Sequence, residues 1–313
     1  MLRQQLSYVV LLALLAGTTL GCSVRRFAIS KIGDAIASGG TTYESDEDIQ
    51  LVGDALPFGL KLIESLLAEV PRHKGLLLAA CQGFTTYSYV YVQQDADVVA
   101  ETNLAQANQL RTRARKLYLR AHGYCLRGLE VRYKGIGERL WAEPSAAASI
   151  VRKKDVPLLY WNAAALGLAI SVSKSDASML ARLPEVEAAV DRALELDESW
   201  NDGALHEFLV VFASAKPGEP DFDRIRKHFQ RALELSQGKH AGLFVAYAEA
   251  VMVPKQNRAE FRALLEKGLA IDPDKHKDVR LANLVAQQRA LRLMARTDDL
   301  ILRETSLTTE EQE

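Results

Sequence analysis

The residues that commonly perform chemistry in proteins form no recognisable catalytic motif in this chain. The sequence contains no Gly-x-Ser-x-Gly nucleophile elbow, Walker loop, dinucleotide-binding fingerprint or paired zinc motif. His206-Glu207 begins like the zinc motif of metalloproteases, but Val210 occupies the position of the required second histidine. Gly135-Ile136-Gly137 is too short to indicate a phosphate-binding loop. We therefore predict a protein that is not an enzyme and uses no cofactor or metal.

Two cysteines, Cys81 and Cys125, lie in apolar segments with helical periodicity. In an oxidising compartment two such thiols could form a disulfide. Their spacing in the sequence does not show whether their Cα atoms come close enough to be bridged. Both interpretations stay open, and two separate buried thiols are slightly favoured.

The N-terminus resembles a bacterial lipoprotein signal. Arg3 precedes the apolar run Tyr8–Ala16, which is too short to span a bilayer but typical of a signal-peptide core. The run ends in Thr19-Leu20-Gly21-Cys22, which is similar to a lipobox and predicts lipid attachment at Cys22. Ser23 after this cysteine favours the outer membrane over the inner one. The alternatives are ordinary secretory cleavage, which would leave Cys22 free, and an uncleaved anchor helix.

The charge is balanced overall but uneven along the chain. A net charge of −1, with 48% apolar and 25% charged residues, indicates a folded globular protein and gives no reason to expect nucleic acid. A helix predicted over about 101–133 is strongly basic. This face would meet an acidic partner, an anionic lipid or a carboxylate ligand, or it is a solvated face balanced by acidic neighbours, which we favour. Its candidate residues are Arg111, Arg115, Arg120 and Arg127.

Aromatic residues are concentrated in the N-terminal half of the chain. The segment from Gly75 to Val92 alternates like a strand in its second half, but its Leu-Ala-Ala start and the absence of a pairing partner favour a helix. For each aromatic residue, packing in the core is the favoured interpretation, and lining of an apolar cleft is the functional alternative. The candidates for such a cleft are Phe84, Tyr87, Tyr91, Trp141, Tyr160 and Trp161.

A helix-pair pattern recurs three times between Leu183 and Ala295. In each unit apolar residues follow the i, i+3, i+4, i+7 spacing of one helix face, and a second apolar helix follows. A small residue, Ala193, Ala232 or Gly268, occupies the same position in each unit, at intervals of 39 and 36 residues. A small side chain there lets two helices approach closely. The units resemble tetratricopeptide (TPR) repeats, so we predict an all-α fold of irregular TPR-like hairpins stacked into a solenoid.

The chain from about Asp46 to Asp299 resembles the TatT family, the TPR lipoproteins associated with TRAP transporters. The resemblance is carried by Asp48–Phe58, Leu60–Glu64, Pro71, Leu76–Ala80 and Phe84–Tyr87, and continues through Tyr160-Trp161 and the C-terminal repeats. It implies a lipid-anchored periplasmic protein that forms a homotrimer and binds a TRAP substrate-binding protein. It also implies an apolar cleft that relays a small hydrophobic carboxylate. The alternative is a structural TPR lipoprotein that scaffolds envelope protein complexes.

These observations predict four segments in the chain. Residues 1–21 are the lipoprotein signal peptide, and residues 22–43 are a tether that carries the lipid. Residues 44–302 form the TPR-like helical domain, and residues 303–313 are a disordered tail. The membrane is reached through the lipid on Cys22.

Overall fold

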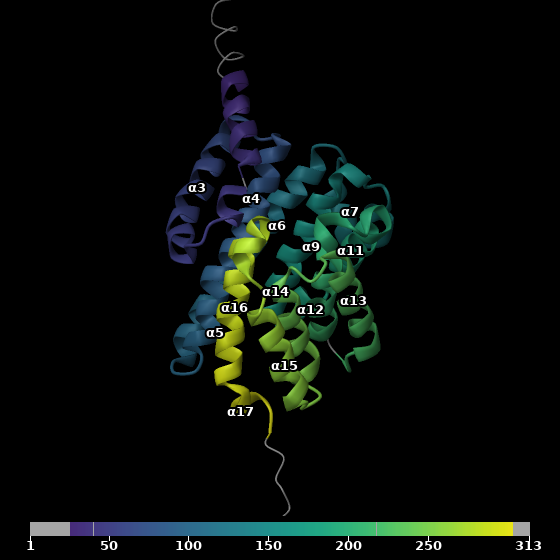
Figure 1. The fold of residues 1–313 in the computed structure, drawn as a ribbon. Helices are drawn as coiled ribbons and strands as arrows, with labels where there is room; N and C mark the ends of the chain where they lie inside the picture. Colours follow the sequence, from purple (N-terminus) through teal and green to yellow (C-terminus); the bar gives the residue numbers. More distant parts are fainter. Residues whose placement is uncertain (1–25, 40, 217, 303–313) are drawn as a thin grey trace, which may run out of the picture. The chain divides into compact units, whose positions relative to one another are not determined.

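A computed structural model describes residues 26–39, 41–216 and 218–302, and every regular element in these ranges is helical (Figure 1). The predicted all-α fold is therefore confirmed. The predicted signal peptide, Cys22 and the predicted tail lie outside the described residues. Within the described ranges no helix has the length and apolar character needed to cross a membrane.

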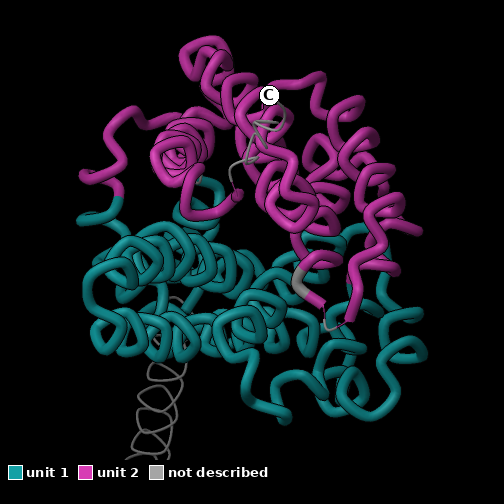
Figure 2. The backbone as a smooth tube through the Cα atoms, turned by 90° about the horizontal axis from the view of Figure 1, so that it is seen from below, with its two compact units in different colours: residues 1–41, 53–189 teal, residues 42–52, 190–313 magenta. Residues whose placement is uncertain are grey.

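The chain divides into two compact units (Figure 2). Unit 1 comprises residues 1–41 and 53–189, and unit 2 comprises residues 42–52 and 190–313. The boundaries fall within two helices, α3 (Ile49–Glu69) and α11 (Leu183–Asp197). The short helix α2 (Thr41–Glu44) lies where the chain first passes from one unit to the other.

Unit 1 is built around the long helix α6, which packs against α4 and α9. Besides α3, its helices are α4 (Lys74–Tyr87), the π-helix η1 (Ser88–Gln93), α5 (Gln94–Val99), α6 (Leu104–Glu130), α7 (Ile136–Ala142), α8 (Pro144–Ser149), the 3₁₀-helix η2 (Lys153–Asp155), α9 (Val156–Ser171) and α10 (Ala177–Leu180). Leu60, Leu76, Leu77 and Phe84 belong to one buried apolar cluster of this unit.

Local chemistry explains where these helices begin. The Oδ1 atom of Asp48 accepts a hydrogen bond from the backbone N–H of Leu51 at 2.9 Å, which caps the start of α3. His73 caps α4 in the same way, because its Nδ1 accepts from the N–H of Leu76 at 3.2 Å. The other ring nitrogen of His73 lies 3.1 Å from the carbonyl oxygen of Ser30, in a helical stretch over residues 26–38. Part of the segment predicted as a tether is thus helical and contacts the cap of α4.

The segment from Gly75 to Val92 is helical, as predicted, but it is not a uniform α-helix. α4 passes into the π-helix η1 at Ser88, whose hydroxyl donates to the carbonyl oxygen of Phe84 at 2.6 Å. The wider π-turn contains Tyr91, whose ring lies against Gly53 of α3. A Cβ atom on Gly53 would come within 2.5 Å of this ring, so the close approach requires glycine.

A disulfide between Cys81 and Cys125 joins α4 to α6. The favoured prediction of two separate thiols was therefore wrong. Both cysteines are fully buried, and their Cα atoms lie 5.4 Å apart although 44 residues separate them in the chain. The packing of α4 on α6 creates this proximity, which the sequence spacing could not reveal.

Unit 2 contains the helices of the predicted repeats from residue 190 of α11 onward. After α11 come the 3₁₀-helix η3 (Trp200–Gly203), α12 (Ala204–Ala215), α13 (Phe222–Leu235), α14 (Ala241–Tyr247), the π-helix η4 (Ala248–Met252), α15 (Arg258–Leu269), two 3₁₀ turns η5 (Pro273–Lys275) and η6 (Lys277–Val279), α16 (Arg280–Ala295) and α17 (Thr297–Leu300). Sequential helices pack against each other, with α12 on α13, α14 on α15 and α15 on α16.

The small residues of the three repeats are all buried, and the predicted close helix contact is seen at Gly268. Ala193 and Ala232 are buried. A Cβ atom added to Gly268 of α15 would lie 3.3 Å from the carbonyl oxygen of Ala241 at the start of α14. The two helices therefore meet almost backbone to backbone at this position.

Candidate functional site

Three arginines of α6 cover three aromatic rings on one surface of unit 1, which we call the aromatic–arginine face. The guanidinium carbons lie 5.9, 5.0 and 5.2 Å from the ring centroids in three pairs: Arg113 with Tyr87, Arg120 with Phe84, and Arg127 with Tyr124. The arginines follow one another at intervals of seven residues, or two helical turns, so they share one face of α6. At these distances each pair makes a cation–π contact.

Polar contacts fix the middle of this face. Arg120 and Tyr124 both reach Glu64 of α3, with Nε and Oη each 2.6 Å from its Oε1. Burial alone would raise the pKa of Glu64, but hydrogen bonds from Lys61 and Tyr124 and the charge of Arg120 outweigh burial and lower this pKa. Glu64 is therefore ionised and neutralises Arg120.

The predicted basic residues differ in how they are paired. Arg111 lies 3.8 Å from Asp97, Arg115 lies 2.6 Å from Asp176, and Arg120 is held by Glu64. Arg127 donates to the carbonyl oxygen of Pro71 at 3.3 Å. Three of the four thus have carboxylate partners within unit 1. In the described ranges neither Arg127 nor Arg113, the third arginine of the face, has one.

Arg113 lies at one end of the aromatic–arginine face, and no described carboxylate occupies its N–H donors. It is exposed, and its Nη2 atom donates to the hydroxyl of Tyr87 at 3.3 Å. Tyr87 in turn contacts Tyr91, with ring centroids 5.7 Å apart. This end combines a guanidinium without an anionic partner and two half-buried aromatic rings, which suits a ligand with a carboxylate and an apolar body.

The six aromatic residues predicted to line a cleft occupy several places in unit 1. Phe84, Tyr87 and Tyr91 lie on α4 and η1, where Phe84 is buried in the core. Tyr160 and Trp161 contact each other on α9, with ring centroids 5.1 Å apart. Trp141 of α7 is 56% exposed, and the guanidinium of Arg182 lies 5.9 Å from its ring. The two pockets described below are lined by other residues.

A buried polar cluster in unit 1 was not predicted. Arg182 contacts Glu185 at 2.8 Å, and one of its N–H groups points at Nε2 of His122, 2.7 Å away. Nε2 must therefore accept, which requires a neutral imidazole with its proton on Nδ1. Burial, together with the charge of Arg182, lowers the pKa of His122 to about 3. His122 shares a buried face of α6 with Cys125 and Leu129, a spacing that the sequence could have flagged.

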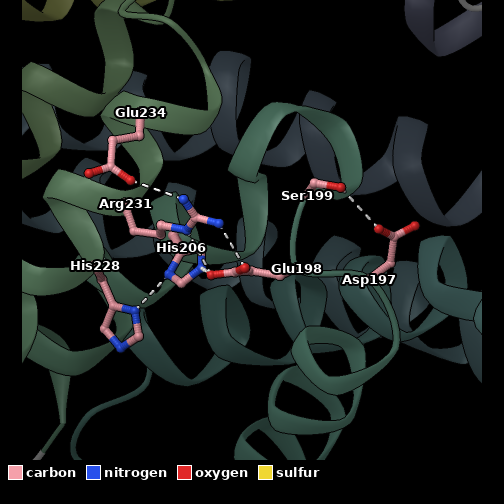
Figure 3. A network of polar contacts seen from close by, with 7 residues as sticks. All are labelled: Asp197, Glu198, Ser199, His206, His228, Arg231 and Glu234. Carbon is pink, nitrogen blue, oxygen red and sulfur yellow. Dashed lines mark hydrogen bonds and ion pairs between the residues drawn. The ribbon is translucent and has the colours of Figure 1, made fainter.

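A second unpredicted network lies in unit 2, around Glu198 (Figure 3). Arg231 of α13 binds both oxygens of Glu198, at 2.8 and 2.9 Å, and His206 of α12 lies 3.0 Å from Oε1. Hydrogen bonds from Arg231, with a smaller contribution from His206, lower the pKa of Glu198 to about 2. His206 also contacts His228 of α13, so the network connects the two helices.

Each unit has a surface pocket. The pocket of unit 1 has a volume of about 430 Å³ and is lined by Arg132, Tyr133, Ile150, Arg152 and Lys154. The pocket of unit 2, of about 660 Å³, is lined by Glu47, Asp48, Ile49, Gln50, Leu284, Gln287, Gln288 and Leu291. In the described part of the chain no group of three or more His, Cys, Asp and Glu side chains is arranged to hold a metal ion.

The described residues form an all-α protein of packed helices. A comparison with known protein families identifies the family of this chain. The family model of the TRAP transporter T-component, TAtT, matches residues 45–301, and the chain belongs to this family. It is a family of transport components and not of enzymes. A protein of Treponema pallidum (strain Nichols), described as uncharacterized, is 27% identical over 302 residues, which cover 90% of this chain and 94% of the relative.

Proposed function

We propose that this protein is a lipid-anchored periplasmic accessory of a TRAP transport system, which binds a substrate-binding protein and relays a small hydrophobic carboxylate. The observation that carries the proposal is the family match over residues 45–301, which includes helices of both units. Lipid attachment at Cys22 would hold the protein at the membrane, with the outer membrane favoured. Self-association into a trimer also belongs to the proposal.

The disulfide supports the proposed compartment. Disulfides persist in oxidising environments such as the periplasm and are rare in the reducing cytosol. The bond between Cys81 and Cys125 is fully buried in the core of unit 1. The proposed location agrees with this chemistry.

The exposed end of the aromatic–arginine face is the proposed contact for the carboxylate ligand. The guanidinium of Arg113 would bind the carboxylate through two parallel N–H···O hydrogen bonds, and Tyr87 and Tyr91 would contact the apolar body. Arg120 is less suited, because Glu64 already neutralises it. The proposed ligand site therefore uses Arg113, which the predicted basic set omitted, with two of the predicted aromatic residues.

Affinity capture of the tagged, lipidated protein from cross-linked envelopes, with mass spectrometry of retained proteins and small molecules, tests the partner. Recovery of a TRAP substrate-binding protein supports the proposed function. Recovery of envelope-assembly proteins alone would instead support the scaffold alternative. Palmitate labelling of the parent and of Cys22→Ser tests the anchor, and light scattering of the purified protein tests the trimer.

The ligand contact is tested with Arg113→Gln and Tyr87→Ala. We expect both variants to lose the co-purifying carboxylate while circular dichroism shows an unchanged helix content. Lys116→Gln is the matched control. Lys116 is also exposed on α6, but it belongs to none of the three arginine–aromatic pairs described above. Equal ligand retention in Arg113→Gln and in the control would remove this face from the proposal. Trp161→Ala tests in the same way whether α9 contributes to binding of the carboxylate.

A further inference from the structure

The pocket of unit 1 carries three cationic side chains around a volume of about 430 Å³. We propose that this pocket binds a small anion through carboxylate or phosphate oxygens. Its lining residues, Arg132, Tyr133, Ile150, Arg152 and Lys154, are distinct from the aromatic–arginine face. The inference does not rest on the proposed function in TRAP transport.

The cations of this pocket are incompletely neutralised. In the part of the chain that the structure describes, no carboxylate lies within ion-pair distance of Arg152 or Lys154. Arg132 contacts Asp155 through a single nitrogen, with Nη1 at 3.4 Å from Oδ2. Because a guanidinium has five N–H donors, Arg132 retains donors for a ligand.

Asp155 organises the pocket without cancelling its charge. This carboxylate is 1% exposed, and it contacts Lys74 through Oδ1 and Arg132 through Oδ2. One negative charge is therefore shared between two cations. Arg152 and Lys154 add positive charge that no described carboxylate balances, so the pocket has an excess of positive charge.

A hydrogen-bond chain fixes the backbone that carries these cations. The hydroxyl of Tyr133 donates to Oδ2 of Asp155 at 2.8 Å and accepts from the backbone N–H of Arg152 at 3.0 Å. Asp155 itself ends η2 and precedes α9, so this chain ties the segment at Arg152 to the end of α6. Donors on a fixed backbone bind a ligand at a lower entropic cost than donors on a mobile loop.

The lining defines the chemical class of the ligand. Guanidinium groups bind carboxylate and phosphate oxygens with two parallel hydrogen bonds, whereas Lys154 acts as a point charge. Ile150, which is 40% exposed, and the ring of Tyr133 offer a small apolar surface. The volume falls within the range of roughly 300–1,000 Å³ that is usual for small-molecule sites. A compact organic anion fits these features.

Isothermal titration of the purified full-length chain tests the proposal with three probes. Citrate represents a free carboxylate, inorganic phosphate a free phosphate, and glycerophosphoglycerol the headgroup of an anionic lipid. We expect at least one probe to bind, and Arg152→Gln/Lys154→Gln to weaken that binding by about tenfold or more. Arg132→Lys keeps the charge but loses the planar fork, so it should weaken binding as well.

The matched control is Lys227→Gln/Arg262→Gln, which removes the same two charges from exposed positions of unit 2. Tightest binding of citrate or phosphate supports a free anion as the ligand, and tightest binding of glycerophosphoglycerol supports the same site with a lipid headgroup. The proposal is overturned if no probe binds. It is equally overturned if the pocket variant and the control weaken binding to the same extent, because the effect would then be one of net charge alone.

Discussion

The imidazole rings of His206 and His228 face each other through their Nδ1 atoms, which lie 2.8 Å apart (Figure 3). This contact needs one proton between the two nitrogens, because two N–H groups would repel and two lone pairs would not bond. Nε2 of His206 lies 3.0 Å from Oε1 of Glu198 and donates to it. The hydrogen-bond network therefore allows at most one of the two rings to be charged.

This pair predicts a loss of stability in acid. Burial and the neighbouring His206 and Arg224 lower the pKa of His228 to about 4, and burial also lowers that of His206 although Glu198 acts in the opposite direction. In the unfolded chain this histidine has a pKa of about 6.5. Below that pH the unfolded state binds the proton more readily than the folded state, so the fold is most stable above it. This stability is lost as the pH falls from 6.5 towards the folded-state pKa of about 4.

The measurement is an NMR titration of the imidazole carbons, combined with urea unfolding at several pH values. We expect both rings to titrate below 6.5, as a coupled pair. His228→Gln should reduce the dependence of unfolding on pH, whereas His276→Gln, outside the pair, should not. Ordinary titration of both rings in the folded protein would contradict the shared proton.

The buried cluster in unit 1 predicts an asymmetric double-mutant cycle. Glu185 is 2% exposed, and burial raises its pKa although Arg182 acts to lower it. Arg182→Met would leave this carboxylate buried without its cation, which costs about 3 kcal/mol. Arg182→Met/Glu185→Leu should be markedly less destabilised, because the charge is removed with its partner. Urea unfolding measures both, and equal losses would show that Glu185 does not depend on Arg182.

The disulfide predicts a redox-dependent stability of unit 1. Opening the loop of 44 residues between Cys81 and Cys125 should lower the free energy of unfolding by about 3–4 kcal/mol. Calorimetry with and without a reducing agent measures the effect. The control is Cys81→Ala/Cys125→Ala, whose stability should not respond to the reductant. An equal response in that variant would mean that the reductant acts elsewhere.

Gly268 occupies the position where each repeat has a small residue, and the stability of the protein should depend steeply on side-chain size there. Gly268→Leu should cost about 3 kcal/mol, because even a Cβ atom there lies 3.3 Å from the carbonyl oxygen of Ala241. Gly268→Ala should cost far less, since better helix propensity offsets the tight contact. Lys267→Leu, at the exposed neighbouring position, is the control. Thermal unfolding compares the three, and similar losses in Gly268→Leu and Lys267→Leu would argue against a close helix contact.

The helices were predictable from the sequence because periodicity reports the buried face of each one. The basic helix expected over about 101–133 is α6, Leu104–Glu130, and the helix expected for Gly75–Val92 is α4 with η1. The π-helix at Ser88 was not foreseen, because a single inserted residue barely changes a pattern of apolar positions.

The sites were less predictable because they depend on which helices pack together. Sequence reasoning treated the aromatic residues around Tyr87 and the arginines of α6 as separate sets, and only the packing of α4 on α6 interleaves them. The bond between Cys81 and Cys125 was missed for the same reason. The contact of His206 with His228 joins residues 22 positions apart on two helices, and no local motif encodes it.

The bond between α4 and α6 also makes the stability of unit 1 depend on the redox conditions of the compartment. Under the proposed location in the periplasm, the newly made chain in the reducing cytosol would lack this covalent link, and unit 1 would be less stable there. Once oxidised, the same unit resists reopening. The crosslink therefore separates a less stable reduced form of unit 1 from a more stable oxidised form.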